Sequence, residues 1–236
     1  MSDLLISLCS GDLETYVAAH ADSSAGGAVC ARFDHELSLV GVASGEGESL
    51  RIENGEGSAE IAWASIGEGL RLTMPGGEEA AANPIEADVE ISAGGGDAER
   101  HELAGIVWSL PAREGGSLRT AWAAIEGGDL LIFMAARPPG AAHGEEIAAC
   151  ARFRPDGDVV TYEEPLLSTE YDGAGSHRRA TLELWQELDT GAAERGGGRR
   201  IRGGGARSEA ARLEAAAFAW ILDGAAGFGG YEIVSG

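Results

Sequence analysis

Lysine is absent from the 236-residue sequence, and basic residues of any kind are scarce. The chain holds 17 arginines against 39 acidic residues, which gives a formal net charge of −22. Such a negative field repels nucleic acid and anionic membrane surfaces, and it aids solubility. We therefore expect no nucleic-acid partner. A compositional bias toward Ala, Gly, Arg and Glu explains the charge, and attraction of a cationic substrate is the alternative.

Long apolar runs are also missing. No stretch of about 18 apolar residues is present, so the sequence predicts no membrane-spanning helix. The first residues lack the basic region of a secretory signal and include Asp3. Cysteine is also scarce. Cys9, Cys30 and Cys150 are widely spaced and form no CxxC pair, which excludes a zinc ribbon or a thioredoxin-like site. Three isolated cysteines predict buried free thiols in a cytoplasmic protein.

Several catalytic motifs are absent as well. The sequence has no G-x-S-x-G, no Walker loop and no GxGxxG between a strand and a helix. Serine hydrolase, P-loop and Rossmann chemistry are therefore disfavoured. His143 precedes Gly144, Glu145 and Glu146, but this spacing is not that of HExxH. We expect no metal and no cofactor.

An Arg- and Gly-rich tract covers residues 191–205. It superficially resembles RNA-binding RGG tracts, but no aromatic residue interleaves its arginines. The sequence predicts an exposed loop around one short strand, with residues 195–207 mobile because glycine raises the entropic cost of ordering.

Short runs with two-residue periodicity dominate the rest of the chain. Ile85, Ala87, Val89 and Ile91, for example, alternate with acidic residues. This periodicity is typical of half-buried antiparallel strands. Strands are expected at residues 4–8, 36–43, 58–64, 69–74, 85–92, 117–126, 129–136, 146–154, 158–162, 165–171 and 181–188. Turn signals at 127–128, 155–158 and 172–175 separate several of them.

Two segments are ambiguous. Residues 208–222 carry apolar side chains at helical spacing after a serine cap, yet their alternating alanines also permit a long buried strand. Residues 12–20 are a second, weaker helix candidate. Charge is uneven along the chain, since residues 1–99 hold 3 arginines and 19 acids while residues 100–236 hold 14 and 20. With the glycine run at 94–96, this asymmetry predicts two domains, residues 1–96 and 97–236.

His101 and the five tryptophans are the residues whose roles are weighed next. His101 stands beside Glu102, a pair able to act as a general base or to orient a ligand. Trp63, Trp108, Trp122, Trp185 and Trp220 are spread over the chain. Most are expected in the core, although inward aromatic residues can also line the cavity of a β-barrel.

Several segments within residues 95–236 carry a further signal, namely 96–108, 137–144, 163–171, 178–180 and 223–232. Together these segments resemble the lipocalin-like hydroxyneurosporene synthase (carotenoid hydratase) superfamily. The resemblance implies an all-β, calycin-like fold of two packed lipocalin-like barrels or sandwich halves. It also implies a strand at residues 208–222. Named members of the family add water to an isoprenoid double bond, and relatives include cyclases and proteins without known activity.

The expected function is therefore binding of an apolar or amphipathic small molecule, of the isoprenoid or polyketide class. An enzyme of the hydratase, isomerase or cyclase type and a structural protein with a degenerate site are the alternatives. Under the enzyme alternative, the candidates for the catalytic acid are Glu102, Asp223 and Glu232, with His101 as partner; no catalytic residue is assigned. The ligand-binding candidates are His101, Trp108, Tyr171, Trp185 and Trp220. His101 and Trp108 reach one cavity only if Gly105 hosts a bulge.

Overall fold

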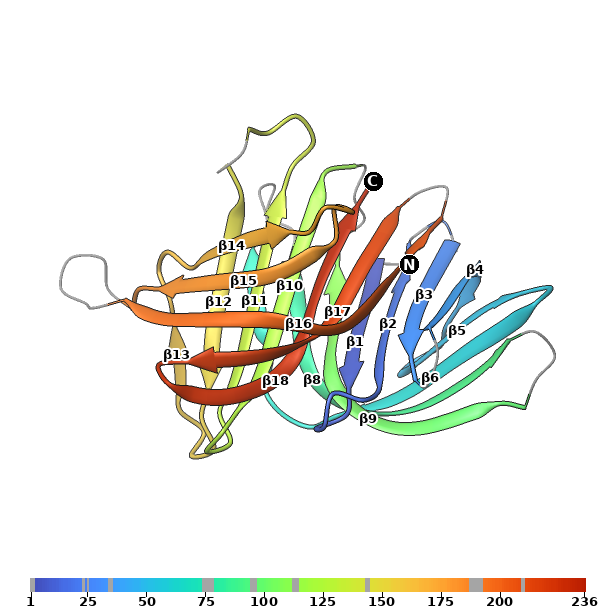
Figure 1. Ribbon diagram of the computed structural model, residues 1–236, viewed down its shortest axis with the longest axis horizontal. Coiled ribbons are helices and arrows are strands. Elements are labelled where there is room, and N and C mark those ends of the chain that lie inside the picture. Colours follow the sequence, from blue (N-terminus) through green and yellow to red (C-terminus); the bar gives the residue numbers. More distant parts are fainter. Residues whose placement is uncertain are drawn as a thin grey trace.

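The structure is a computed structural model that describes residues 3–22, 24, 26–33, 36–73, 79–93, 97–111, 115–142, 145–186, 193–208 and 211–236. These residues form 18 β-strands in two antiparallel sheets and contain no helix (Figure 1). The expectation of an all-β antiparallel protein is confirmed. No described helix is long and apolar enough to cross a membrane.

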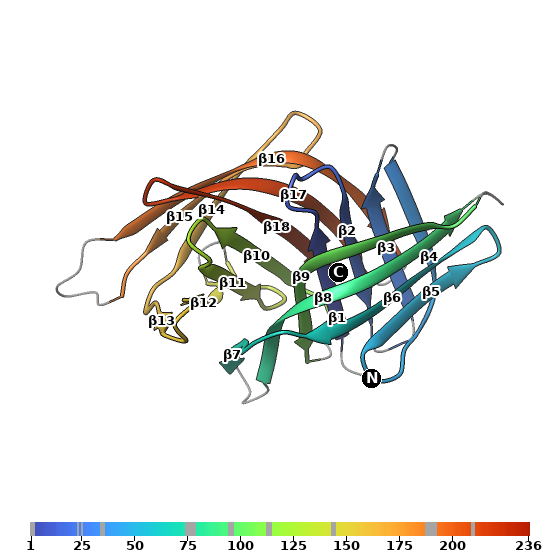
Figure 2. The same cartoon turned by 90° about the horizontal axis from the view of Figure 1, so that it is seen from below.

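The first sheet contains the first nine strands in the order β6-β5-β4-β3-β2-β1-β9-β8-β7. An additional pairing of β6 with β8 joins its two sides, so eight of these strands form a closed barrel (Figure 2). The strand bounds are β1 Asp3–Cys9, β2 Tyr16–Ala21, β3 Gly26–Arg32, β4 Glu36–Ser44, β5 Ser49–Asn54, β6 Gly57–Ser65, β7 Leu70–Thr73, β8 Glu79–Ala93 and β9 Glu99–Leu110.

The second sheet has the order β13-β12-β11-β10-β18-β17-β16-β15-β14 and stays open as a half-barrel. Its strands β16 and β17 reach toward β2 and β3 of the barrel (Figure 1). The strand bounds are β10 Ser117–Ile125, β11 Leu130–Arg137, β12 Ile147–Phe153, β13 Val159–Thr161, β14 Leu166–Tyr171, β15 His177–Leu184, β16 Glu194–Arg207, β17 Arg212–Leu222 and β18 Ala225–Ser235.

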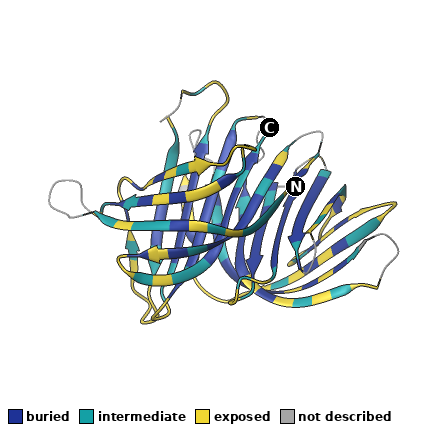
Figure 3. Ribbon diagram, in the orientation of Figure 1, coloured by how far each residue is buried: buried dark blue, intermediate teal, exposed yellow. Residues whose placement is uncertain are grey.

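Three apolar clusters hold the molecule together. Figure 3 shows buried residues along the strands of both sheets. The barrel core fills the closed barrel and includes Leu8, Ile52, Ile61 and Val107. The inner core of the half-barrel includes Phe133, Phe218 and Trp220. The inter-sheet core contains residues of both sheets, among them Leu5, Trp108, Trp122 and Leu213. Burial of this shared apolar surface favours the association of the two sheets.

The expected strands follow the two-residue alternation closely. In β8, Ile85, Val89 and Ile91 are buried in the barrel core, while Glu86 and Glu90 are exposed. The three turn signals are also confirmed, with positive φ angles at Gly127, Gly128, Gly157 and Gly175. Of the expected strand at 181–188, β15 ends at Leu184, and residues 187 and 188 lie outside the described residues.

The strand alternative for residues 208–222 is confirmed. β17 pairs with β16 on one side and β18 on the other. Leu213, Ala215 and Ala217 belong to the inter-sheet core, whereas Phe218 and Trp220 belong to the half-barrel core. A strand that is buried on both faces reads as a nearly continuous apolar run, which is why its periodicity also matched a helix.

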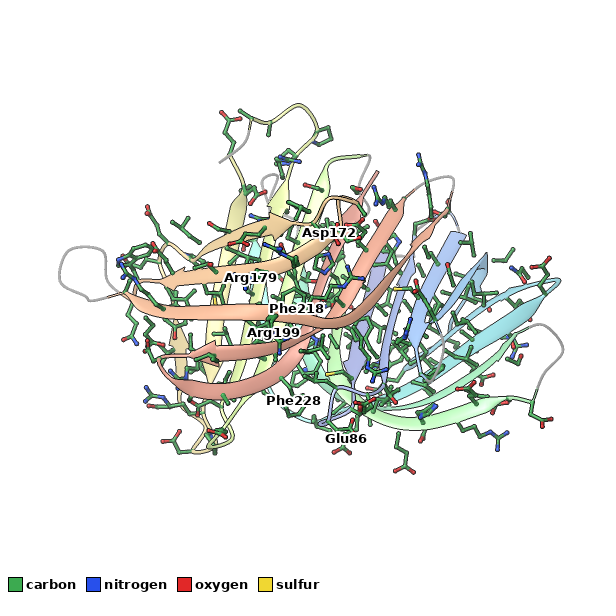
Figure 4. All side chains as sticks on the ribbon, in the orientation of Figure 1. Glu86, Asp172, Arg179, Arg199, Phe218 and Phe228 are labelled. Atoms are coloured by element: carbon green, nitrogen blue, oxygen red, sulfur yellow. The ribbon has the colours of Figure 1, made fainter. Side chains whose placement is uncertain are left out.

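Two local expectations are wrong. The helix expected at residues 12–20 is a turn followed by β2, because β2 pairs with both β1 and β3. The loop expected at 191–205 is largely β16, which pairs with β15 and β17 along its length. Glycine makes this strand possible, since a Cβ at Gly198 would lie 2.6 Å from the Trp220 ring. Arg199, the next residue, is exposed opposite Arg179 of β15 (Figure 4).

The two sheets divide between β9 and β10, that is, between Leu110 and Ser117. Residues 96 and 97 fall between β8 and β9, which are neighbours in the first sheet. A division into domains 1–96 and 97–236 stays a prediction. Cys9, Cys30 and Cys150 are buried free thiols, as expected. Burial raises the pKa of the Cys30 thiol to about 12, so this thiol stays protonated and unreactive near neutral pH.

Candidate functional site

One end of the barrel is closed by a pair of stacked rings. Phe33 follows β3, and His101 lies near the start of β9. Their ring centroids are 4.4 Å apart and the ring planes are nearly parallel, at 7°. Phe33 also belongs to the barrel core, so the pair covers that core at this end. His101 therefore has a packing role at the end of the barrel.

The opposite end of the barrel is hollow. A pocket of about 300 Å³, here called the barrel mouth, opens there. The described residues that line it are Leu4, Ala21, Gly45, Gly47, Ser49, Leu50, Trp63, Ser65, Asn83, Val107 and Ser109. None of these side chains is ionisable. Apolar and uncharged polar groups thus meet in one concave site, which is the usual lining of a small-molecule pocket.

Trp63 is the largest side chain of the barrel mouth. Its strand, β6, directs Ala59 and Ile61 into the barrel core, and Trp63 follows two residues later on the same face. It is only partly buried because it stands near the end of the strand, where the core gives way to the mouth. An indole in this position offers a ligand a broad apolar surface with one hydrogen-bond donor.

His101 and Trp108 do not share a cavity. β9 pairs with β1 and β8 without a register shift, so Gly105 hosts no bulge. Residues seven apart on a regular strand point to opposite faces. His101 stacks at the end of the barrel core, whereas Trp108 is fully buried in the inter-sheet core. The expectation that both side chains reach one cavity is wrong, because the strand stays regular at Gly105.

The other three aromatic candidates are also dispersed. Trp220 is buried in the half-barrel core against Phe218, with ring centroids 5.3 Å apart. Trp185 is half-buried just after β15, and its carbonyl accepts a hydrogen bond from the backbone N–H of Glu163. Tyr171 lies on the edge strand β14 and is 51% exposed. None of the three lines the barrel mouth, and a ligand-binding role for them stays a prediction.

Two of the three candidate acids lie at the surface. Glu102 is exposed on the outer face of the barrel, where Glu86 and Asp88 join it around a hollow of about 780 Å³. Asp223 lies in the turn between β17 and β18, and its carboxylate accepts a hydrogen bond from the Arg195 N–H at 3.1 Å. Neither residue lines the barrel mouth.

Glu232 is the most deeply buried acid among the described residues. It lies on β18 at 0% exposure, in contact with the barrel across the inter-sheet core. Ser7 and Tyr16 donate hydrogen bonds to Oε1 at 2.5 and 3.0 Å, and Thr120 donates one to Oε2 at 2.8 Å. Trp122 donates in turn to the Ser7 hydroxyl at 2.7 Å. This Glu232 network thus joins the two sheets through polar contacts.

The environment of Glu232 determines its acidity. Burial penalises the charged carboxylate and raises its pKa to about 7, although the three hydroxyl donors act in the opposite direction. Glu232 lines none of the hollows found among the described residues. Its carboxyl group is therefore a potential proton donor by chemistry, but the structure gives a substrate no access to it.

Metal ligands do not gather in the described part of the chain, where no group of three His, Cys, Asp or Glu side chains is placed to hold an ion. His143 and Gly144 lie outside the described residues. Glu146, from the same segment, forms an ion pair with Arg119.

Sequence reasoning missed most of the barrel mouth and of the Glu232 network. Trp63 carried a usable signal, because it follows Ala59 and Ile61 at two-residue spacing near the end of an expected strand. Ser7, Tyr16 and Thr120 carried none, since small polar residues within apolar strands are common. Their assembly around one carboxylate depends on contacts between residues more than 100 positions apart in sequence.

The sequence matches no protein family model and no curated protein. Solved structures with the same fold do exist, and three of them are informative. CghA, solved with Sch210972, is 13% identical with a TM-score of 0.64 over 99% of this chain and 88% of its own. A protein described as AttH from Nitrosomonas europaea is 12% identical, with a TM-score of 0.63 over 99% and 91%. Kievitone hydratase from Nectria haematococca is 11% identical, with a TM-score of 0.57 over 99% and 88%.

At identities this low, the similarity shows the fold alone. It supports the lipocalin-like architecture that the sequence resemblance implied, and it leaves membership of the superfamily a prediction. The comparisons cover nearly the whole chain, so they include both the closed barrel and the half-barrel. The protein is a lipocalin-like, two-sheet β protein similar in fold to CghA, AttH and kievitone hydratase.

Proposed function

We propose that the protein binds an uncharged apolar or amphipathic small molecule in the barrel mouth. The observation that carries this proposal is the uncharged lining of that pocket in a chain with a net charge of −22. Charged side chains surround the barrel on its outer face, yet none lies among the described residues of the mouth. A hollow of about 300 Å³ is at the lower end of the range for small-molecule sites.

The pocket suits a ligand with an apolar body and one or two hydrogen-bonding groups. Leu4, Leu50 and Val107 supply apolar contact, and the Trp63 indole supplies a flat face. Asn83 and Ser109 supply donors and acceptors that hold no charge. The solved structures of similar fold include one with a bound compound and one named as a hydratase, which supports a role that involves small molecules.

Binding is favoured over hydratase, isomerase or cyclase chemistry. Proton donation to an alkene requires an acid that contacts the ligand. The barrel mouth has no ionisable side chain among its described residues, and Glu232 lies in the inter-sheet core. The geometry therefore supports a ligand carrier or sensor, with the isoprenoid and polyketide classes as candidates for the ligand.

Titration with the neutral fluorescent dye N-phenyl-1-naphthylamine tests the proposal. Trp63→Leu removes the indole face of the mouth, and we expect the dye to bind about tenfold more weakly, a loss of about 1.4 kcal/mol. Trp185→Leu is the matched control, because it makes the same change at a half-buried tryptophan outside the mouth. Equal affinities in the two variants, or no dye binding to the unmodified protein, would refute the proposal. If the dye binds as expected, native mass spectrometry of protein purified from its own host would identify the natural ligand that it retains.

A further inference from the structure

Another hollow, of about 500 Å³, lies where the half-barrel meets the barrel. We call it the inter-sheet hollow. β4 of the barrel contributes Glu36, and the half-barrel contributes His177, Arg200, Arg207, Arg212 and Glu214. It shares no described lining residue with the barrel mouth. The lining of the inter-sheet hollow is therefore charged, whereas the lining of the barrel mouth is uncharged. The two sites must bind ligands of different charge.

The glycines of β16 create this space. Gly203, Gly204 and Gly205 line the hollow without side chains of their own. A Cβ at Gly204 would lie 3.0 Å from the Glu36 carboxylate and 3.7 Å from the Cys30 Cβ. Larger residues would thus fill the gap between β16 and the barrel. The glycine-rich tract is a low-complexity segment of the sequence, and in the fold its lack of side chains leaves space for a polar hollow.

A bulge in β16 determines which arginines face the hollow. Arg200 pairs with Phe218 and Arg202 with Ala217, so Ile201 is the extra residue. The bulge reverses the alternation and places Arg200 and Arg202 on different faces. Arg200 lines the hollow, whereas Arg202 forms an ion pair with Glu14. A regular strand would have directed both guanidinium groups to the same side.

The charges of the lining do not cancel. Three arginines and two glutamates give it a formal charge of +1 within a chain of −22. Arg212 is paired with Glu214, and Glu36 with Arg32 at 3.4 Å. Arg200 and Arg207 form no ion pair with a described residue, which leaves their donors available to a ligand. A surplus of one positive charge matches a monoanion better than a dianion.

His177 supplies an unsatisfied polar atom in the same place. The residue is 1% exposed, and its ring packs against Phe218 and Tyr231. Nε2 lies 3.0 Å from the Tyr231 carbonyl oxygen, which can only accept, so Nε2 carries a proton. Nδ1 has no hydrogen-bond partner, because the nearest Glu214 oxygen is 3.9 Å away. A buried polar atom without a partner is costly unless a ligand or water satisfies it.

We propose that the inter-sheet hollow binds a small monocarboxylate through Arg200 and Arg207. Nδ1 of His177 carries no proton when Nε2 does, so it accepts a hydrogen bond from water or from a hydroxyl group of the ligand and not from its carboxylate. Guanidinium groups bind carboxylates with paired, charge-assisted hydrogen bonds. Val40, Ala206 and Leu213 line the same hollow and supply contact for the apolar part of such a ligand. The proposal is independent of ligand binding in the barrel mouth.

Calorimetric titration with three probes tests the charge of the ligand. Benzoate carries the single negative charge, benzamide is its neutral isostere, and phenyl phosphate is a dianion at pH 8. We expect benzoate to bind at least about tenfold more tightly than either of the others. Equal binding of benzoate and benzamide, tighter binding of phenyl phosphate, or no benzoate binding at 10 mM would overturn the proposal.

Neighbouring arginines on β16 provide a matched pair of variants. Arg200→Gln removes a guanidinium group from the hollow, while Arg199→Gln removes one from the exposed outer face (Figure 4). Both change the net charge equally, so a general electrostatic effect would weaken benzoate binding in both. We expect a loss of at least about tenfold in Arg200→Gln alone, and the same in Arg207→Gln, with unchanged melting temperatures. Equal losses in the Arg199 and Arg200 variants would show that no site is present.

Discussion

At the scale of single residues, Glu232 combines complete burial with a raised pKa. Its carboxyl group accepts three hydrogen bonds from hydroxyl groups but has no cationic partner among the residues that contact it. Hydroxyl donors stabilise the charged form only in part, and burial outweighs them. The folded protein therefore binds a proton at Glu232 that the unfolded chain releases above pH 4.5.

This difference predicts a dependence of stability on pH. Because the folded pKa of about 7 exceeds the unfolded value of 4.5, the contribution of Glu232 is fully present below pH 4.5 and is lost as the pH rises to 7. The loss amounts to ~3 kcal/mol. Glu232→Gln cannot ionise, so we expect its stability relative to the unmodified protein to improve by that amount between pH 4.5 and pH 8.

Urea unfolding at several pH values measures the effect. Glu102→Gln is the control, because it neutralises an exposed carboxylate of the same kind on the outer face of the barrel. A constant difference in stability between Glu232→Gln and the unmodified protein across this pH range would contradict the prediction. It would show that water or a counter-charge reaches the Glu232 carboxylate in solution.

At the scale of elements, β16 shows how glycine supports a strand rather than a loop. Gly196 and Gly198 lie opposite Leu222 and Trp220 of β17. The large side chains of β17 cover these glycines, so the sheet keeps a packed inner face without side chains from β16. Such covering of strand glycine by an aromatic neighbour stabilises a β-sheet.

Substitution of two adjacent glycines should have unequal effects. Gly198→Ala introduces a methyl group 2.6 Å from the Trp220 ring and 2.8 Å from the Phe218 ring, and we expect a loss of about 1–3 kcal/mol from overpacking. At Gly197 a Cβ would meet only the Ala180 carbonyl oxygen, at 3.7 Å. Gly197→Ala should therefore be neutral or slightly stabilising. Chemical denaturation of both variants measures the difference, and equal stabilities would contradict the placement of Trp220 over Gly198.

At the scale of the whole molecule, the inter-sheet core couples the two sheets. Leu5 and Trp108 from the barrel pack in the same cluster as Trp122 and Leu213 from the half-barrel. The Glu232 network joins the same surfaces through Ser7 and Tyr16 of the barrel. Separation of the sheets would expose this apolar surface and leave a buried polar network incomplete, and both are unfavourable.

We therefore expect the molecule to unfold in a single transition. Leu213→Ala removes a fully buried side chain from the inter-sheet core and should destabilise by about 2–5 kcal/mol. The loss should be equal when it is monitored by hydrogen exchange of amides in the barrel and in the half-barrel. Two separate transitions in calorimetry, with the variant affecting one of them, would instead show that the barrel and the half-barrel unfold independently.

Local sequence determined the class of this fold. The alternation around Ile85–Ile91 predicts a half-buried strand because successive side chains of a strand point to opposite faces. The Gly127-Gly128 and Pro155–Asp158 turns were equally readable, since positive φ at glycine is a local property. The local sequence did not determine whether the β17 segment is a strand or a helix. Both faces of β17 are buried, so its apolar residues fit the strand period of 2 and the helix period of 3.6 alike.

Tertiary structure alone decided the sites. The regularity of β9 separates His101 from Trp108, although sequence proximity suggested a shared cavity. The closure of β6 on β8 turns a strand-end tryptophan, Trp63, into the wall of a pocket. Burial in the surrounding core raises the pKa of Glu232, and hydrogen bonds from Ser7 and Tyr16 oppose this effect. These groups approach the carboxyl group only when the two sheets pack. Periodicity depends on the residues next along the chain, whereas pockets and pKa values depend on residues that only folding brings near.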